Sequence, residues 1–452
     1  MEKQMEYELN KYFHSVRLVE DKCKGCTHCI RTCPTEAIRV RNGKATIIEE
    51  KCIDCGECIR TCPNDAKIAF ADTLESIKKY SYKIAIPAPS LVGQFSKKYK
   101  LEKVLSAFLF LGFDEILEVG FGADLVARAA TEYLQSQAIF LSKPVISSAC
   151  PAVVKLIQVK YPGLAENILP MQSPMEVTAH FIKEDVSRRL GMGKADIGVF
   201  FITPCPAKVT VVKQPVGTNR SWVDGAIAVS ETVNNIKMNF NRVSESAGVQ
   251  KASNGGIGWG RRGGEAATVK VPNKLSVDGI HHVSSVLERI EAGGFKGINF
   301  IEAQACVGGC VGGVLMVENP FMAKLKVDIV SEQVGEKNEW LIEKAYKENP
   351  REYYLLTEKI KPRPIGRLDA DMGEAMRKLQ EIEALCAELP GIDCGSCGCP
   401  TCRAFAEDVV SGMMMRMDCL FDLRDRVRSL AQEISALAEK LPHAMQEKGA
   451  NQ

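Results

Sequence analysis

The sequence predicts a multidomain protein with four parts: a small α+β domain, a larger α/β domain with parallel sheets, a small helical domain and a C-terminal helix. Eighteen cysteines, many of them in short-spaced groups, predict the two small domains. Apolar, β-branched runs that alternate with amphipathic helical stretches predict the α/β domain between them. We expect domain limits at residues 1–80, 81–365, 366–419 and 420–452.

The composition excludes several classes of partner and favours one kind of metal site. The 452 residues include 58 basic and 56 acidic side chains, a net charge of +2, so we expect neither nucleic acid nor an anionic membrane as a partner. Residues 1–6 are polar, and the longest apolar stretch, 104–116, is too short to span a bilayer. We therefore expect a cytoplasmic protein. Clustered cysteines without a secretory signal favour metal clusters over disulfides, and six histidines without zinc-finger spacing make zinc the weaker interpretation.

The first cysteine group is a tandem repeat of Cys-x2-Cys-x2-Cys-x3-Cys-Pro. Its members are Cys23, Cys26, Cys29 and Cys33, followed by Cys52, Cys55, Cys58 and Cys62. Over residues 15–75 the spacing is similar to that of bacterial two-cluster ferredoxins, in which the fourth cysteine of each half reaches the other cluster. Cys23, Cys26, Cys29 and Cys62 are thus expected to hold one [4Fe–4S] cluster, and Cys52, Cys55, Cys58 and Cys33 the other. Asn42-Gly43 predicts a hairpin turn between strands at 37–40 and 45–48.

Buried strands are predicted at 83–87, 116–119, 145–148, 197–203 and 297–303, and helices at 101–110 and 175–190. Cys150, Cys205 and Cys306 each come just after one of these strands. Ligand sites of α/β sheets lie at the carboxyl ends of the strands. With Cys310, these cysteines supply four thiolates, enough for one further cubane cluster.

Three segments, 147–151, 203–208 and 306–313, resemble the signature motifs of the iron-only ([FeFe]) hydrogenases, and the resemblance extends over residues 83–362. It implies an H-cluster, which joins a [4Fe–4S] cluster to a two-iron subsite with CO and cyanide ligands. By this resemblance Cys150, Cys205, Cys306 and Cys310 ligate the [4Fe–4S] part. Cys310 also bridges to the two-iron subsite, and Lys208 donates to an iron-bound cyanide.

The functional hypothesis is based on the residues that depart from these motifs. Ala149 stands where catalytic members have a cysteine that delivers protons, and a methyl group cannot relay a proton. Val153, Thr203 and Gln304 replace a tryptophan and two methionines of the family pattern. Losing a positioned acid or base typically costs ~10²–10⁴-fold in rate. The pattern resembles that of sensory [FeFe] hydrogenases, so we expect a hydrogen or redox sensor with slow, reversible hydrogen oxidation and proton reduction.

Between the second and third motifs, residues 258–263 formally match the dinucleotide-binding pattern GxGxxG. No apolar strand precedes them, so we do not expect a dinucleotide site there. They instead resemble a glycine-rich stretch of the hydrogenase domain.

The tail adds a third cysteine group. Asp371 and Glu374 predict a capping box that opens a helix through Leu385. Four cysteines then follow at a specific spacing: Cys394, Cys397, Cys402 and Cys419. They resemble the small [4Fe–4S] domain of corrinoid iron–sulfur proteins. This resemblance implies one more [4Fe–4S] cluster, in addition to the two of the tandem repeat. Cys386 and Cys399 fall outside the pattern and are expected to be structural or incidental thiols.

A heptad stripe follows Cys419 and ends at Pro442. Its members are Leu420, Leu423, Val427, Leu430, Ile434, Leu437 and Leu441. Two interpretations remain open: a helix packed on its own domain, or a seam at 420–441 for a homodimer or a docked partner. Other expected partners are hydrogen and protons, a redox protein such as ferredoxin, and a signalling kinase or phosphatase.

Two alternatives to a sensor remain. One is a ferredoxin-dependent catalytic [FeFe] hydrogenase that uses another proton route. The other is an iron–sulfur assembly factor without the two-iron subsite, which Lys208 disfavours because no cyanide would need it.

Overall fold

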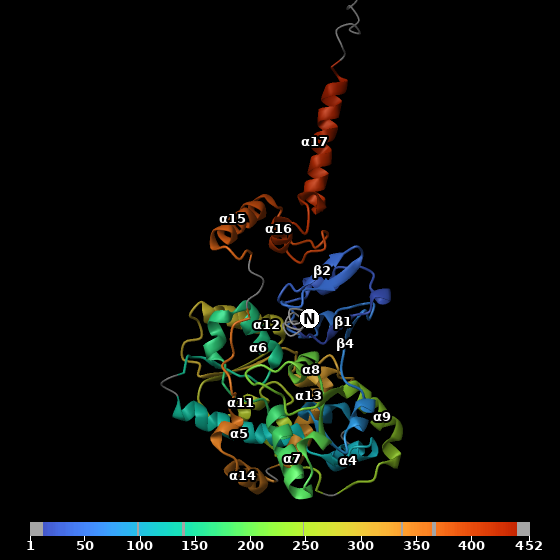
Figure 1. Cartoon of the computed structure of the whole chain (residues 1–452), viewed down its shortest axis with the longest axis vertical. Helices are drawn as coiled ribbons and strands as arrows, with labels where there is room; N and C mark the ends of the chain where they lie inside the picture. Colours follow the sequence, from blue (N-terminus) through green and yellow to red (C-terminus); the bar gives the residue numbers. More distant parts are fainter. Residues whose placement is uncertain are drawn as a thin grey trace, which may run out of the picture. The chain divides into compact units, whose positions relative to one another are not determined.

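The structure, a computed structural model, describes residues 12–96, 99–137, 141–246, 248–335, 338–363 and 368–440 (Figure 1). The chain forms two compact units. Unit 1 comprises Met1–Lys22 and Ile48–Ile365, and unit 2 comprises Cys23–Ile47 and Gly366–Gln452. The units cut across the expected domain at 1–80 because the two halves of its cysteine repeat pack against different parts of the chain.

Unit 1 is built around two parallel sheets. The first has the strand order β6-β5-β8-β9. Its strands are β5 (Tyr82–Pro87), β6 (Glu115–Ile116), β8 (Ile197–Thr203) and β9 (Gly225–Ala228). The second has the order β10-β11-β7, with β7 (Val145–Ile146), β10 (Lys274–Asp278) and β11 (Phe300–Gln304). All seven residues of β8 are buried, as expected for a parallel sheet covered on both faces.

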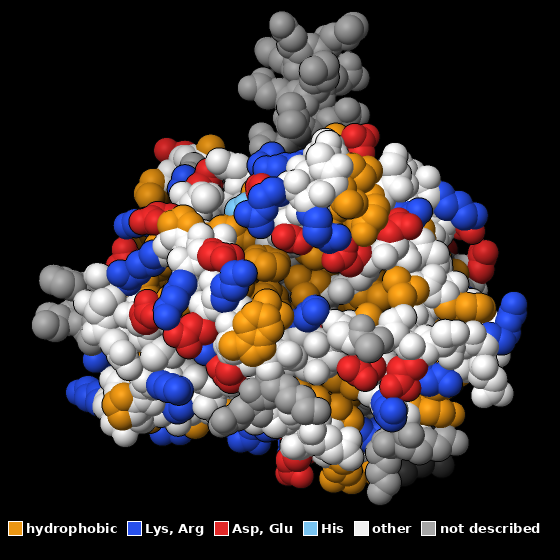
Figure 2. All heavy atoms as spheres, turned by 90° about the horizontal axis from the view of Figure 1, so that it is seen from below, with side chains coloured by type: hydrophobic (Ala, Val, Ile, Leu, Met, Phe, Trp, Pro, Cys, Tyr) orange, Lys and Arg blue, Asp and Glu red, His pale blue; other side chains and the backbone are white. Residues whose placement is uncertain are grey.

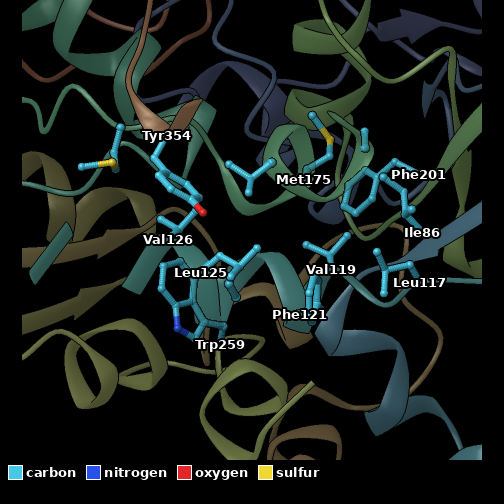
Figure 3. Close-up of a cluster of buried hydrophobic side chains, with 14 of the residues drawn as sticks. Ile86, Leu117, Val119, Phe121, Leu125, Val126, Met175, Phe201, Trp259 and Tyr354 are labelled. Atoms are coloured by element: carbon cyan, nitrogen blue, oxygen red, sulfur yellow. The ribbon is translucent and has the colours of Figure 1, made fainter. Parts of the chain in front are cut away.

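The helices of unit 1 pack around these sheets and against one another. They are α4 (Leu101–Phe110), α5 (Val119–Ser136), α6 (Pro151–Lys160), α7 (Pro174–Leu190), α8 (Pro206–Lys213), α9 (Val229–Asn239), α10 (Asn254–Gly258), α11 (Gly264–Thr268), α12 (Ile280–Glu291), α13 (Pro320–Val334) and α14 (Glu339–Glu348). Helices α5 and α7 pack tightly, since a Cβ atom on Gly122 would lie 2.1 Å from the hydroxyl oxygen of Thr178. Figure 3 shows part of the resulting core, a cluster of buried apolar side chains that includes Val119, Met175, Phe201 and Trp259.

Several expected elements occur as predicted. Helix α4 covers 101–110, β8 covers 197–203, and α7 begins one residue before the expected 175, with Ser173 as its N-cap. The expected strand at 116–119 is wrong beyond its first residue, because β6 ends at Ile116 and Val119 starts α5. Strands β9 and β10 were not predicted. The first is a short run of small residues and the second begins with an exposed lysine, so neither has the apolar signal of a buried strand.

The two halves of the cysteine repeat each have a short helix and a pair of antiparallel strands. In unit 1, β1 (Val16–Leu18) pairs with β4 (Lys67–Ala69) beside α3 (Glu57–Arg60). In unit 2, β2 (Ile38–Arg41) pairs with β3 (Lys44–Ile47) beside α2 (His28–Arg31). The predicted turn is present: Asn42 and Gly43 both have positive φ, 49° and 73°, as a two-residue hairpin of this type requires.

Unit 2 also holds α15 (Met372–Glu388), α16 (Cys402–Val410) and α17 (Leu420–Ala438). Asp371 caps α15 by accepting a bond from the amide of Glu374 at 2.9 Å. The expected capping box is incomplete, because the amide of Asp371 donates to Asp369 instead, and the helix continues three residues beyond Leu385. The six heptad residues of α17, from Leu420 to Leu437, are between 40% and 66% exposed. Leu441 and Pro442 lie outside the described residues.

Within the described ranges, no helix has both the length and the apolar character needed to cross a bilayer. Figure 2 shows basic and acidic side chains interspersed over one face of the molecule, in keeping with the nearly balanced charge of the sequence.

Candidate functional site

The three hydrogenase-like motifs meet in unit 1 at the carboxyl ends of strands from both parallel sheets. Cys150 follows β7 and caps α6, and Cys205 follows β8 and caps α8. In both helices a proline takes the first position, where it suits the backbone. Cys306 follows β11, and Cys310 opens a short 3₁₀ helix, η7 (Cys310–Gly312). Helix N-termini favour negative charge, so α6 and α8 suit thiolate ligands at Cys150 and Cys205.

Three of these thiols line one cavity, whose empty space amounts to about 660 Å³ including its opening to solvent. Cys150, Cys205, Cys310, Lys208 and Ala149 line it. The fourth thiol, Cys306, is close enough to the other three that their charges raise its pKa. The remaining wall is mostly apolar and includes the side chains of Val119, Met175, Phe201 and Trp259 (Figure 3). The structure thus brings together all the residues that the sequence assigned to an H-cluster.

The electrostatics of the cavity test whether such a group fits. Burial and the neighbouring thiols raise the pKa of Cys205 to about 11 and that of Cys310 to about 12, and they raise the pKa of Cys306 well above its usual value. Lys208 opposes this at Cys205 and Cys310 by lowering their pKa values. Four thiolates crowded at one place need additional positive charge, and a bound metal cluster deprotonates its thiols outright. The donor set therefore fits an iron–sulfur group.

Ala149 and Lys208 both line the cavity. The amide of Ala149 donates to the hydroxyl of Ser147 at 3.1 Å, and the methyl group lines the cavity without offering a donor. Lys208 lies on α8, three residues after Cys205, and also lines an adjoining cavity beside Glu176. Burial raises the pKa of both Glu176 and Glu265, and the charge of Lys208 opposes this rise.

Two buried carboxylates near the cavity are absent from the site residues expected from the sequence. Glu265 lines it and accepts a bond from Ser147 at 2.6 Å. Glu302 lies on β11 and is 1% exposed. A signal was present for the second, because Glu302 interrupts the apolar run of a predicted buried strand.

The second half of the cysteine repeat packs beside this site in unit 1. Asp54, between Cys52 and Cys55, forms a buried ion pair with Lys155 of α6 at 3.2 Å. Arg60 donates to the carbonyl of Gly312 at 2.6 Å, in the loop that carries Cys310. Cys55, Cys150 and Cys205 all pack against one hydrophobic cluster that includes Ile53. The second repeat is therefore packed against the elements that carry the cysteines of the cavity.

The first half of the repeat packs in unit 2 with the C-terminal cysteines. Asp408 of α16 accepts from Arg39 at 2.8 Å and also bonds Arg41. The amide of Val40 donates to the carbonyl of Gly398 at 2.8 Å, and Arg31 donates to the carbonyl of Cys394 at 2.6 Å.

The C-terminal cysteines share a small hydrophobic core. The thiols that pack in or against it are Cys386, Cys397, Cys399, Cys402 and Cys419. The thiol of Cys399 is buried and donates to Asp408 at 3.4 Å. Cys394 contributes its carbonyl to Arg31, as described above.

Each repeat shows the same bond at its fourth cysteine. The amide of Ala37 donates to the sulfur of Cys33 at 3.2 Å, and the amide of Ala66 donates to the sulfur of Cys62 at 3.3 Å. Hydrogen bonds to sulfur are one means by which proteins tune cluster potentials. We expect Cys62 to complete the cluster of the first repeat and Cys33 to complete that of the second. This exchange of ligands involves residues of both units, and it stays a prediction.

Comparisons with known proteins agree with this arrangement. The family model "Iron only hydrogenase large subunit, C-terminal domain" matches residues 81–276 and 265–314, which together cover just over half of the chain. A 4Fe–4S dicluster model matches residues 15–63, and a further Fe–S cluster model matches residues 389–421.

Iron hydrogenase 1 of Clostridium pasteurianum is 25% identical over 255 residues, which are 47% of this chain and 44% of the relative. The chain thus spans about half the length of that relative. The periplasmic [Fe] hydrogenase large subunit of Nitratidesulfovibrio vulgaris is 26% identical over 360 residues, covering 66% of this chain and 86% of the relative. A cytosolic Fe–S cluster assembly factor NAR1 homolog of Schizosaccharomyces japonicus is 28% identical over 112 residues, 21% of this chain and 22% of the relative.

Among solved structures, a variant of the [FeFe]-hydrogenase HydA1 from Chlamydomonas reinhardtii superposes with a TM-score of 0.53. The match covers 65% of this chain and 98% of that one, at 16% sequence identity, so it shows the fold alone. The family match, the cysteine-lined cavity and the fold together show that this chain is an iron–sulfur protein of the iron-only ([FeFe]) hydrogenase family.

Proposed function

We propose that the cavity holds an H-cluster and that the protein is a hydrogen or redox sensor with slow, reversible hydrogen chemistry. One observation carries the proposal: a single cavity is lined by thiols and Lys208, and Ala149 occupies the position of the proton-delivering cysteine. A sensor requires the cofactor to change state with hydrogen, and it does not require rapid turnover.

In this proposal Cys150, Cys205, Cys306 and Cys310 hold the [4Fe–4S] part, and Cys310 also holds the two-iron subsite. The bound group would supply the site at which hydrogen is split and formed. Lys208 would hold a cyanide ligand, since a buried ammonium needs an anionic partner. The influence of Lys208 on the pKa of Cys310 supports its nearness to that end of the cavity.

The remaining cysteines are proposed to bind three further [4Fe–4S] clusters. Two would lie in the tandem repeat and one among the C-terminal cysteines. The bond from Arg60 to the Cys310 loop supports electron exchange between the second repeat and the cavity. A redox protein such as ferredoxin would be the external donor or acceptor.

Infrared spectroscopy of the matured protein tests the cofactor. Iron-bound CO and cyanide bands are expected in the unmodified protein and should be lost in Cys310→Ser, with the ferredoxin-type clusters retained. Cys386→Ser is the matched control, because Cys386 lies outside the proposed ligand sets, and its bands should stay. CO and cyanide bands that persist in Cys310→Ser would contradict the ligand assignment.

Ala149→Cys tests the sensory interpretation. The restored thiol should raise hydrogen turnover by about tenfold or more at unchanged CO and cyanide band intensity, because positioned acids typically contribute ~10²–10⁴-fold and part of the route remains to be rebuilt. Turnover in the unmodified protein that already matches catalytic relatives would favour a ferredoxin-dependent catalytic hydrogenase.

The NAR1-like match supports an assembly factor as a second candidate. Matured protein without CO or cyanide bands would select it.

A further inference from the structure

A buried ion pair lies between the second cysteine repeat and helix α6. The ammonium of Lys155 on α6 is 3.2 Å from Oδ2 of Asp54, which lies between Cys52 and Cys55 in the sequence. Lys155 is 4% exposed and Asp54 is 1% exposed. Replacing a buried ion pair by well-packed apolar side chains is often neutral or stabilising. Stability alone therefore gives little reason for this pair.

The other carboxylate oxygen of Asp54 joins the ion pair to helix α8. It accepts bonds from the amides of Ser15 and Val16 at 2.9 Å and 3.3 Å. The hydroxyl of Ser15 donates to the carbonyl of Pro206 at 2.8 Å and accepts from the hydroxyl of Thr210 at 3.1 Å. The loop of the second repeat is thus bonded to both helices that are capped by cysteines of the cavity.

Both charges lie close to a proposed ligand of the second-repeat cluster, which is the [4Fe–4S] cluster proposed for Cys52, Cys55 and Cys58. The sulfur of Cys52 is 3.9 Å from Oδ1 of Asp54. Burial lowers the pKa of Lys155, and the charges of Asp54 and then Cys52 oppose this shift, so the ammonium also lies near that sulfur. Because the pair is buried, solvent and salt screen its charges little.

A charge beside a cluster changes how easily the cluster is reduced. Net charge, hydrogen bonds to the sulfurs and solvent exposure are the factors by which a protein sets a cluster potential. Reduction adds one negative charge, so an ammonium nearby stabilises the reduced cluster and a carboxylate nearby destabilises it. The carboxylate of Asp54 is held by two backbone amides as well as by Lys155, and these donors offset part of its charge.

We propose that the ion pair of Asp54 and Lys155 sets the reduction potential of the second-repeat cluster, and that the ammonium of Lys155 makes this cluster easier to reduce. The inference rests on the proposed function, which assigns a [4Fe–4S] cluster to this repeat. The step is the transfer of one electron from the cavity's cluster, which is oxidised, to the second-repeat cluster, which is reduced. No bond forms or breaks. In a sensor, this potential determines the hydrogen level at which electrons leave the cavity.

The first test measures this potential without the two-iron subsite. The protein is reconstituted with iron and sulfide, and its clusters are titrated with a reductant while their electron paramagnetic resonance signals are recorded. The signal that is lost in Cys55→Ser identifies the second-repeat cluster. In Lys155→Met we expect the equilibrium constant for reduction of this cluster to fall about tenfold, which is a shift of ~59 mV to lower potential.

Shifts of opposite sign distinguish an electrostatic role from a structural one. Asp54→Asn should raise the potential, because it removes the charge that opposes Lys155. The double variant Asp54→Asn, Lys155→Met should lie near the unmodified value. Damage to the fold would not produce two opposite shifts that cancel. Lys155→Arg keeps the positive charge and should keep the potential.

Lys160→Met is the matched control for the loss of a lysine. Lys160 lies on the same helix but is exposed to solvent, where its charge is screened, so its replacement should leave the potential unchanged. Lys155→Gln, which also removes the charge, serves if the methionine variant does not fold.

The second test uses the matured protein under hydrogen. At equal hydrogen pressure and pH, the ratio of reduced to oxidised second-repeat cluster should be about tenfold lower in Lys155→Met than in the unmodified protein. The CO and cyanide bands should keep their intensity, because no ligand of the cavity is changed.

The outcomes separate this proposal from the proposed function. Equal potentials in Lys155→Met and the unmodified protein, or shifts of the same sign in Lys155→Met and Asp54→Asn, would overturn the role of the ion pair and leave the H-cluster in place. Matured protein without CO and cyanide bands would overturn the H-cluster, whereas the potentials of the first test would still decide the role of the ion pair. A Cys55→Ser variant that loses no cluster signal would overturn the proposal together with the cluster assigned to this repeat.

Discussion

The two halves of the cysteine repeat have the same ligand spacing but different surroundings. The second half belongs to unit 1 and packs beside the cavity, and the first belongs to unit 2 and packs with the C-terminal cysteines. Equivalent arginines make equivalent bonds: Arg60 donates to the loop of Cys310, and Arg31 donates to the carbonyl of Cys394, each at 2.6 Å. Each repeat thus uses one arginine to hold the loop of another cysteine group.

The residues between the ligands account for the difference. Gly25 and Asp54 occupy the same position in the two repeats, and both have positive φ, 67° and 55°. A Cβ atom on Gly25 would lie 2.6 Å from the carbonyl oxygen of Gly43, so the loop there must lack a side chain. Asp54 instead bonds the amide of Ser15 at 2.9 Å and pairs with Lys155. One backbone shape therefore serves close packing in one repeat and a buried ion pair in the other.

Among the changes that test this difference between the two repeats, Asp54→Ala is expected to have the largest effect on stability. It leaves the ammonium of Lys155 buried without its partner, which typically costs about 3–5 kcal/mol. We expect the free energy of unfolding of unit 1 to fall by this amount in denaturant titrations. Unchanged stability of unit 1 would show that the ion pair does not hold the second repeat.

The matched change in unit 2 is Asp408→Ala. It removes the carboxylate shared by Arg39 and Arg41, and we expect a smaller loss of about 3 kcal/mol because Arg41 is partly exposed to solvent. Limited proteolysis should detect loosening of the C-terminal cysteines from the 38–47 hairpin. Unit 1 should keep its unfolding midpoint. A loss of stability of similar size in unit 1 would contradict the view that the two repeats are held in place independently.

Gly25→Ala and Gly43→Ala test how much the loop backbone of the first repeat contributes to stability. Both glycines have positive φ, but a Cβ atom on Gly43 meets nothing within 4 Å. A left-handed residue with a side chain costs about 1–2 kcal/mol. We expect this loss for Gly43→Ala and a larger one for Gly25→Ala, measured by hydrogen exchange of the hairpin amides. Equal losses would mean that the close approach of Gly25 to Gly43 is unimportant.

The smallest effect on the chemistry is expected from a stop codon after Cys419. All proposed cluster ligands are retained, so the CO and cyanide bands should not change. Val427 and Ile434 alternate with Leu423, Leu430 and Leu437 along the exposed stripe of α17, a pattern that favours parallel two-stranded coiled coils. Analytical ultracentrifugation should therefore show a dimer of the full chain and a monomer of the truncated one. Loss of the infrared bands would place the tail in the core of the protein.

Much of this protein is determined by short windows of its sequence. The cysteine spacings, the Asn42-Gly43 turn and the apolar runs of β5 and β8 act over a few residues, so local geometry and periodicity suffice to predict them. The replacement at Ala149 is equally visible, because it lies inside a recognisable motif.

Only the tertiary structure decided which parts of the chain the two repeats pack against and which polar groups reach the cavity. Asp54 meets Lys155 across 101 residues, and Arg39 meets Asp408 across 369. Ser147 and Glu265 are 118 residues apart, yet they share one hydrogen bond. Such pairs leave no periodic signal in the sequence, because they depend on how distant elements pack and on the burial that makes an unpaired charge costly.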